Sequence, residues 1–294
     1  MTLLVGDFQY TWRDLLKSHA GTTIVLDPAD ANYGFPGRVT LIRDGKVVDW
    51  VFVGSTDVAR NPLAILAACG KFRPNFTEES QVLLFPYRAS PVLHQLALRV
   101  AQALPLTRIK VPTGSGLEKI SWPLGAEEIE LPAAFPNMVL QAQRRARWLE
   151  LIEQSSDHTI DLTQVGIEGS RLGSGNKLEI EGWNGWAEVS GDTLLLVGTE
   201  DPPEEKISRF MDFAHTRKVS IQDQQKYRGL ICAFASQEGE DFGMGVVQSF
   251  DASSGKMEIK CTAVSPAPVR LLRLGSLRID ESGKELPGLP AWSL

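Results

Sequence analysis

The sequence predicts an α/β fold, in which a mainly parallel sheet is flanked by helices, followed by a β-rich C-terminal domain. Two observations lead to this prediction. In residues 1–155, apolar strand-like runs alternate with helix-like segments, and parallel strands need such crossover connections. After residues 155–157 the pattern changes to short alternating runs that are separated by Gly and Asn turns. We therefore expect two domains, residues 1–155 and 156–294.

The composition excludes several classes of protein. A hydrophobic content of 43% with 22% charged residues is typical of a soluble globular protein. The net charge of −6 argues against sequence-independent coating of DNA, which needs a basic surface. The apolar runs are far shorter than the ~20 residues of a membrane span. The 3 cysteines match no metal-ligand spacing, so we expect no metal site and interpret them as buried reduced thiols of a cytoplasmic protein.

The first elements form a parallel βαβ unit. A short strand over Thr2–Val5 is followed by a helix that begins with a capping box at Thr11–Asp14 and stops at Gly21. A second strand, Thr22–Leu26, follows directly. Strand, helix and strand in this order predict two parallel strands of one sheet.

The second strand ends on acidic residues, Asp27-Pro28-Ala29-Asp30. Open α/β sheets place such residues in a crevice at the carboxyl ends of their strands, although a core strand that ends in solvent-facing acids has the same pattern. A turn at Gly34–Gly37 then leads into two extended runs, 38–42 and 47–53, which the hairpin signal Asp44-Gly45 joins.

The rest of the first domain alternates helices and strands. We expect helices over 62–72, 91–103 and 137–153, with Asn61 and Ser90 as the N-caps of the first two. The first of these helices carries apolar residues on nearly every side, which predicts burial all round. Strands are expected over 82–85 and 108–111.

Several short motifs resemble, in order, a run of the polynucleotide 5′-hydroxyl kinases, which are P-loop proteins of RNA processing. The matching segments are Asp27-Pro28, Gly34-Phe35-Pro36-Gly37, Phe52-Val53-Gly54-Ser55-Thr56 and Asn61-Pro62-Leu63, and in the C-terminal part Gly229–Ala233, Gly243–Val247 and Val269–Arg278. The resemblance implies a P-loop-kinase-like sheet followed by the β module of these kinases. It also implies ATP, Mg²⁺ and a 5′-hydroxyl RNA or DNA end as substrates.

The phosphate-binding loop departs from the family pattern. A P-loop reads G-x-x-x-x-G-K-[ST], in which the Lys meets the phosphates and the hydroxyl holds Mg²⁺. Here Gly6 is kept, but Thr11, Trp12 and Arg13 stand where Gly, Lys and Ser/Thr are expected. Trp12 cannot supply the charge, and Arg13 cannot ligate magnesium. The sequence therefore predicts a degenerate loop.

The remaining nucleotide-pocket candidates come from this comparison. They are Gly6, Thr11, Arg13, Asp27 and Asn32. If any phosphoryl-transfer chemistry remains, Asp30 is the candidate base, and Asn32 stands for the Gln of the kinases. In the alternative interpretation Asp27 caps the turn and Asp30 is solvated.

Three arginines, Arg144, Arg145 and Arg147, lie on the helix over 137–153, where the kinases have an arginine-rich lid. Arginine suits a lid because its fork binds phosphate oxygens bidentately. In the alternative, they form a solvated face that pairs with Glu150 and Glu153.

Two features of the C-terminal domain have a functional and a structural interpretation. Trp183 and Trp186 suit a base-stacking platform or a packed core, and we favour the core because no basic groove surrounds them. Arg270, Arg273 and Arg278 form either a basic edge or the solvent face of a strand.

The leading hypothesis is a non-catalytic relative of these kinases that binds a protein partner or an RNA or DNA 5′ end. For such a non-catalytic relative we expect no cofactor. The first alternative is an active polynucleotide kinase or nucleotide hydrolase with an atypical loop, which would use ATP and Mg²⁺. The second is a cleft that now holds a small metabolite. The sequence does not predict an oligomeric state.

Overall fold

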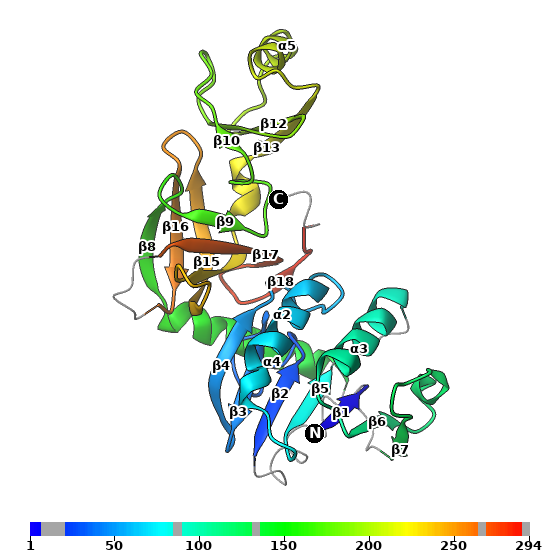
Figure 1. Cartoon of the computed structure of the whole chain (residues 1–294). Coiled ribbons are helices and arrows are strands. Elements are labelled where there is room, and N and C mark those ends of the chain that lie inside the picture. Colours follow the sequence, from blue (N-terminus) through cyan, green and yellow to red (C-terminus); the bar gives the residue numbers. More distant parts are fainter. Residues whose placement is uncertain (7–20, 85–89, 131–135, 264–268, 290–294) are drawn as a thin grey trace. The chain divides into compact units, whose positions relative to one another are not determined.

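We analysed a computed structural model that describes residues 1–6, 21–84, 90–130, 136–263 and 269–289 (Figure 1). The chain forms two compact units, Met1–Trp148 and Leu149–Leu294, and each is described by itself. Across these described ranges, no helix is long and apolar enough to cross a membrane. The predicted helix that begins at Thr11 lies outside the described residues.

The first unit contains a seven-stranded sheet of order β4-β3-β2-β5-β1-β6-β7. The strands are β1 (Thr2–Val5), β2 (Thr22–Leu26), β3 (Arg38–Arg43), β4 (Lys46–Phe52), β5 (Gln81–Leu84), β6 (Arg108–Pro112) and β7 (Glu127–Ile129). The pairs β2–β5, β5–β1, β1–β6 and β6–β7 are parallel, whereas the pairs β2–β3 and β3–β4 are antiparallel. The predicted mainly parallel sheet is confirmed, whereas β7 was not predicted.

The hairpin between β3 and β4 turns at the predicted dipeptide. Asp44 and Gly45 have φ values of 50° and 73°. Both values lie in the left-handed region, where Asp is tolerated and Gly is unstrained, so this turn matches the twist of the two strands. The hairpin prediction is confirmed.

Three helices belong wholly or mainly to the first unit: α2 (Pro62–Phe72), α3 (Pro91–Ala103) and α4 (Asn137–Gln154). The side chain of Asn61 accepts a hydrogen bond from the N–H of Ala64, and that of Ser90 accepts one from Leu93, as predicted for two N-caps. Short 3₁₀ turns are η1 (Arg73–Asn75) and η2 (Leu117–Lys119).

The expectation that α2 is buried all round is wrong. Its buried side chains are Ile65, Ala68, Cys69 and Phe72, which lie on one face. Leu63 on another face is 75% exposed. The pattern misled because the helix is rich in alanine, which is compatible with either environment and therefore hides the boundary between the two faces.

The two faces of the sheet have separate cores. Leu3, Ile24 and Val82 belong to the larger core, which also contains buried side chains of α2 and α3. Figure 1 shows these two helices on the same side of the sheet. The alternate residues Leu4 and Val25 belong to a smaller core on the other face, as the two-residue period of a strand requires.

The second unit is mainly antiparallel. One sheet has the order β18-β17-β14-β15-β16-β8, with β9 paired to β17, and the other has the order β10-β11-β12-β13. The elements are β8 (Ser156–Asp161), β9 (Gly166–Glu168), β10 (Asn176–Lys177), β11 (Trp186–Ser190), β12 (Thr193–Gly198), α5 (Glu204–Phe213), β13 (Lys218–Asp223), η3 (Gln224–Tyr227), β14 (Leu230–Ala235), β15 (Asp241–Asp251), β16 (Lys256–Cys261), β17 (Leu271–Ile279) and β18 (Glu285–Leu286). The predicted β-rich domain is confirmed.

Two details of this unit differ from prediction. The first of the alternating runs, which the sequence extends over 159–165, forms a strand only as far as Asp161, because the N–H of Gln164 donates to the carbonyl of Asp161 and closes a turn. In addition, β12 and β13 are parallel and α5 connects them, so the unit contains a βαβ crossover. The three cysteines are buried and outside any disulfide, as predicted.

Candidate functional site

The topology indicates where a ligand would bind. In the sheet of the first unit, β1 lies between β5 and β6, and the chain visits β2 and β5 on one side of it before β6 and β7 on the other. Open α/β sheets bind ligands outside the carboxyl ends of their strands at such a reversal of direction. Gly6 directly follows β1 at this point and is buried. Thr11, Trp12 and Arg13 lie outside the described residues.

Asp27 follows β2 at the same edge and holds the turn. Its side chain is 1% exposed, and Oδ1 accepts a hydrogen bond from the N–H of Ala29 at 2.9 Å. Its backbone carbonyl accepts from the N–H of Asp30 at 3.1 Å. These bonds agree with the interpretation of Asp27 as the cap of this turn.

Asp30 is engaged in the loop. Oδ1 accepts from the N–H and the side-chain amide of Asn32, at 3.0 and 2.9 Å, and Oδ2 accepts from the N–H of Tyr33 at 3.2 Å. Burial raises the pKa of Asp30, and the hydrogen bonds and the charge of Arg147 partly offset this increase. Asp30 is partly exposed, and its carboxylate is bound by the loop instead of being free in solvent.

Arg147 is the lid candidate that lies against this loop. From α4, its Nε donates to the carbonyl of Ala31 at 2.8 Å and its Nη2 to that of Asn32 at 3.3 Å. Arg145 is exposed and Arg144 is partly exposed. The structure therefore brings Arg147, Asp30 and Asn32 together, and it gives Arg147 the role of holding the loop.

Arg38 is part of this cluster but was not identified from the sequence. Its guanidinium carbon lies 5.3 Å from the ring centroid of Phe35 and 5.2 Å from that of Trp50. Among the described residues, its buried Nε has no hydrogen-bond partner. Burial lowers the pKa of Arg38 to about 10; the charge of Asp30 opposes this shift and that of Arg147 adds to it. The available signal was an arginine at the start of β3, diagonally opposite Trp50 in the hairpin.

Gly34 makes room for this guanidinium. A Cβ at position 34 would overlap the Nη2 and Cζ atoms of Arg38. The lack of a side chain at Gly34 therefore leaves the space that the guanidinium of Arg38 occupies.

Backbone hydrogen bonds join the matching motifs. The N–H of Gly37 donates to the carbonyl of Pro28 at 2.7 Å, and the carbonyl of Gly37 accepts from the N–H groups of Val53 and Gly54, each at 2.9 Å. The amide of Asn61 then donates to the carbonyl of Val53 at 3.1 Å. Segments that are separate in the sequence thus form one connected edge of the sheet.

The described residues of this edge enclose little space and gather no set of metal ligands. The cavity lined by Asp27, Asp30 and Asn32, and by Leu140 and Gln143 of α4, measures about 10 Å³, roughly the space of one water molecule. In the described parts of the chain, no three His, Cys, Asp or Glu side chains gather as metal ligands. We therefore derive no reaction step through ATP or Mg²⁺.

The tryptophans of the second unit are structural, as favoured from the sequence. Trp186 is 3% exposed, packs edge-on against Phe250, and donates from Nε1 to Glu188 at 2.9 Å. Trp183 packs edge-on against Phe210 of α5. Both rings therefore contribute to packing, which leaves no paired stacking platform.

The three C-terminal arginines do not form one basic edge. Arg273 is paired with Glu168 and Asp241, which neutralise it. Arg278 donates from Nε to the backbone carbonyl of Arg228 at 3.0 Å, whereas Arg270 is exposed.

Comparison with known proteins identifies relatives. No protein-family model matches the sequence. A polyribonucleotide 5′-hydroxyl-kinase of Thermococcus kodakarensis is 27% identical over 182 residues, which are 58% of this chain and 51% of the kinase. A second one, from Pyrococcus horikoshii, is 22% identical over 158 residues, 49% of this chain and 41% of the kinase. The chain is a homologue of the polyribonucleotide 5′-hydroxyl-kinases. It spans about half the length of these curated relatives.

Solved structures support the fold of this kinase homologue. A complex of Clp1p with Pcf11p, described as the structural basis for ATP loss in a point mutant, matches with a TM-score of 0.57 at 11% identity. The match covers 94% of this chain and 74% of that chain. The wild-type Clp1p–Pcf11p complex matches with a TM-score of 0.55 at 11% identity and the same coverage. The two sequence relatives confirm the resemblance to the polynucleotide kinases, and these structures confirm the predicted fold class.

Proposed function

We propose that this kinase homologue is non-catalytic and binds a nucleic-acid 5′ end or a protein partner at the edge formed by the carboxyl ends of β1 and β2. One observation carries the proposal: the sequence after β1 has Thr11, Trp12 and Arg13 where a P-loop has Gly, Lys and Ser/Thr. The buried free cysteines fit a reducing compartment such as the cytoplasm.

The chemistry of phosphoryl transfer explains the importance of these positions. The reaction depends on positioning and on neutralising the charge of the phosphates, for which P-loop enzymes use the Lys, Mg²⁺ and the hydroxyl that holds Mg²⁺. Trp12 supplies no charge, and the guanidinium of Arg13 repels a cation instead of ligating it.

The state of Asp30 supports the same proposal. A general base needs a lone pair that can reach the hydroxyl of the substrate. Here three hydrogen bonds from Asn32 and Tyr33 occupy the carboxylate, and Arg147 holds the same loop from α4. Asp30 therefore stabilises the loop in the arrangement observed.

An active kinase is the second candidate. It is favoured by the names of the two relatives, both polyribonucleotide 5′-hydroxyl-kinases. In that case Asp30 would leave the bonds to Asn32 and Tyr33, and Arg13 would take the place of the lysine.

A protein partner is supported by a different observation: Clp1p was solved in complex with Pcf11p.

The test is a phosphoryl-transfer assay with labelled ATP, Mg²⁺ and an RNA oligonucleotide that has a 5′-hydroxyl end. The Thermococcus kodakarensis kinase is the positive control. We expect no label transfer by the parent chain or by Asp30→Asn. Transfer by the parent chain that Asp30→Asn abolishes, and that Asp44→Asn in the exposed hairpin turn preserves, would contradict the proposal.

A further inference from the structure

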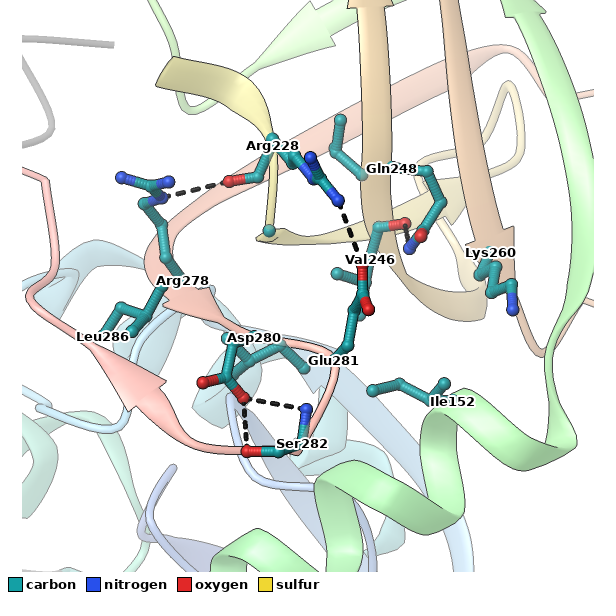
Figure 2. Close-up of a pocket in the computed structure, with 13 residues that line it drawn as sticks. Ile152, Arg228, Val246, Gln248, Lys260, Arg278, Asp280, Glu281, Ser282 and Leu286 are labelled. Atoms are coloured by element: carbon teal, nitrogen blue, oxygen red, sulfur yellow. Dashed lines mark hydrogen bonds and ion pairs between the residues drawn. The ribbon is translucent and has the colours of Figure 1, made fainter. Parts of the chain in front are cut away.

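The second unit contains a pocket of about 680 Å³ that the comparisons and the sequence analysis do not assign. It lies between β15, β16, the end of β17 and the turn into β18, with Ile152 of α4 on one side (Figure 2). Its volume is in the range of small-ligand and side-chain pockets.

Gly229 lines the pocket where β14 begins between β15 and β17. Its N–H donates to the carbonyl of Val247 in β15, and its carbonyl accepts from the N–H of Ile279 in β17, both at 2.8 Å. It has a φ of 81°, and a Cβ there would lie 2.6 Å from the carbonyl oxygen of Ile279. Gly229 thus continues the pairing of β14 with its two neighbouring strands, and the register with β17 shifts just after it, between Leu230 and Cys232.

The floor of the pocket is aliphatic. Val246 and Ile279 are 4% and 2% exposed, and Ile152 and Leu286 are partly buried. Among the described residues that line the pocket, none is aromatic. A single-stranded nucleic acid needs stacking partners for its bases, so this lining favours an aliphatic side chain as the occupant.

Cationic side chains surround this floor. Figure 2 shows Arg278 on β17 at one side and Lys260 on β16 at the other. The Nε of Arg278 is held by the carbonyl of Arg228 at 3.0 Å. Within the described chain, no carboxylate forms an ion pair with Lys260 or Arg278. Both cations are therefore available to an incoming anion.

The acidic residues of the pocket are already engaged. Oδ1 of Asp280 accepts from the N–H and hydroxyl of Ser282, at 2.9 and 2.7 Å, and from the N–H of Lys284 at 3.0 Å. Glu281 pairs with Arg228 at 3.0 Å, but these side chains are 87% and 61% exposed. An exposed pair contributes little and is readily exchanged for another carboxylate.

We propose that this pocket binds a short acidic segment of a protein partner, with one aliphatic side chain on the floor and flanking carboxylates on Arg278 and Lys260. Charge complementarity selects this occupant. Arg278 and Lys260 attract carboxylates, whereas the aliphatic floor accepts only an apolar side chain. The pocket shares no residue with the edge of β1 and β2, so its test is independent of the proposed function.

The test measures the anisotropy of labelled peptides in which one Leu, Ile, Val or Met is flanked by Asp and Glu, with the full chain as receptor. Binding should weaken about tenfold or more in Arg278→Glu and in Lys260→Glu, as expected for the loss of a desolvated ion pair. Lys256→Glu is the matched control, since Lys256 is exposed on the same strand as Lys260 and does not line the pocket. It should leave binding within about twofold.

Further probes separate the alternatives. Peptides with Ser in place of the aliphatic residue, or Lys in place of the acids, should not bind. A labelled oligouridine RNA distinguishes a nucleic-acid site. The proposal is overturned if no peptide of the panel binds. It is also overturned if Arg278→Glu and Lys260→Glu, shown to be folded by thermal unfolding, leave peptide binding unchanged. A third contrary outcome is that only the RNA binds and these two substitutions abolish that binding.

Discussion

Arg147 and Ala31, which are 116 residues apart, are joined by a 2.8 Å hydrogen bond from the Nε of the arginine to the backbone carbonyl. The bond fixes the loop after β2 against α4 and places a positive charge near Asp30. An arginine from the expected lid region thus serves in this arrangement as a support for the loop.

Removing this support should destabilise the chain. Arg147→Ala loses the bonds to Ala31 and Asn32 and leaves two carbonyls without a donor, so we expect a loss of about 1–3 kcal/mol. Urea unfolding of the full chain measures it. Arg99→Ala is the control, because Arg99 is exposed on α3 and bonds only the nearby Gln102 among the described residues. Equal effects of the two substitutions would show that Arg147 does not hold the loop.

The close approach of Gly34 and Arg38 predicts a non-additive pair. Gly34→Ala should cost about 1–3 kcal/mol, because the new methyl group displaces a guanidinium stacked between Phe35 and Trp50. In the background of Arg38→Ala, the same change should cost much less. A double-mutant cycle by chemical unfolding checks this, and strictly additive effects would refute it.

Glu188 predicts a pH-dependent stability in the second unit. Its Oε2 accepts from Gly173 and Trp186, whereas its buried Oε1 has no partner among the described residues. Burial raises the pKa of Glu188, and those hydrogen bonds partly offset the increase. In the unfolded chain the carboxyl group ionises near its ordinary pKa of about 4.3. The folded state is therefore penalised as pH rises above that value, until the folded pKa is passed.

Glu188→Gln removes this penalty. At neutral pH we expect it to stabilise the chain by about 1 kcal/mol, or roughly 4 °C in Tm. The gain should shrink towards pH 4, where the carboxyl group of both states takes up a proton. Thermal unfolding across this range measures it, with Glu179→Gln, at an exposed position of the same unit, as control. A variant that is less stable than the parent at neutral pH contradicts the account.

The features that local chemistry determines were predictable. Asp44-Gly45 specifies its hairpin and Asn61-Pro62 its helix start, because each signal acts within a few residues. The contact of Arg147 with Ala31 joins distant segments, and a single sequence carries no signal for such a pair. The parallel pairing of β12 and β13 was not predicted for the same reason, since the role of α5 as a crossover depends on tertiary packing.

The central claim is tested most directly by measuring the thermal unfolding midpoint of the chain with and without ATP and Mg²⁺. A ligand that binds only the folded state at about 100 times its Kd adds about 2.7 kcal/mol and must raise the midpoint. We predict that millimolar ATP with Mg²⁺ leaves the midpoint of this chain unchanged, while it raises that of the Thermococcus kodakarensis kinase. A magnesium-dependent increase in this chain that Arg13→Ala removes would contradict the claim and establish a working nucleotide site.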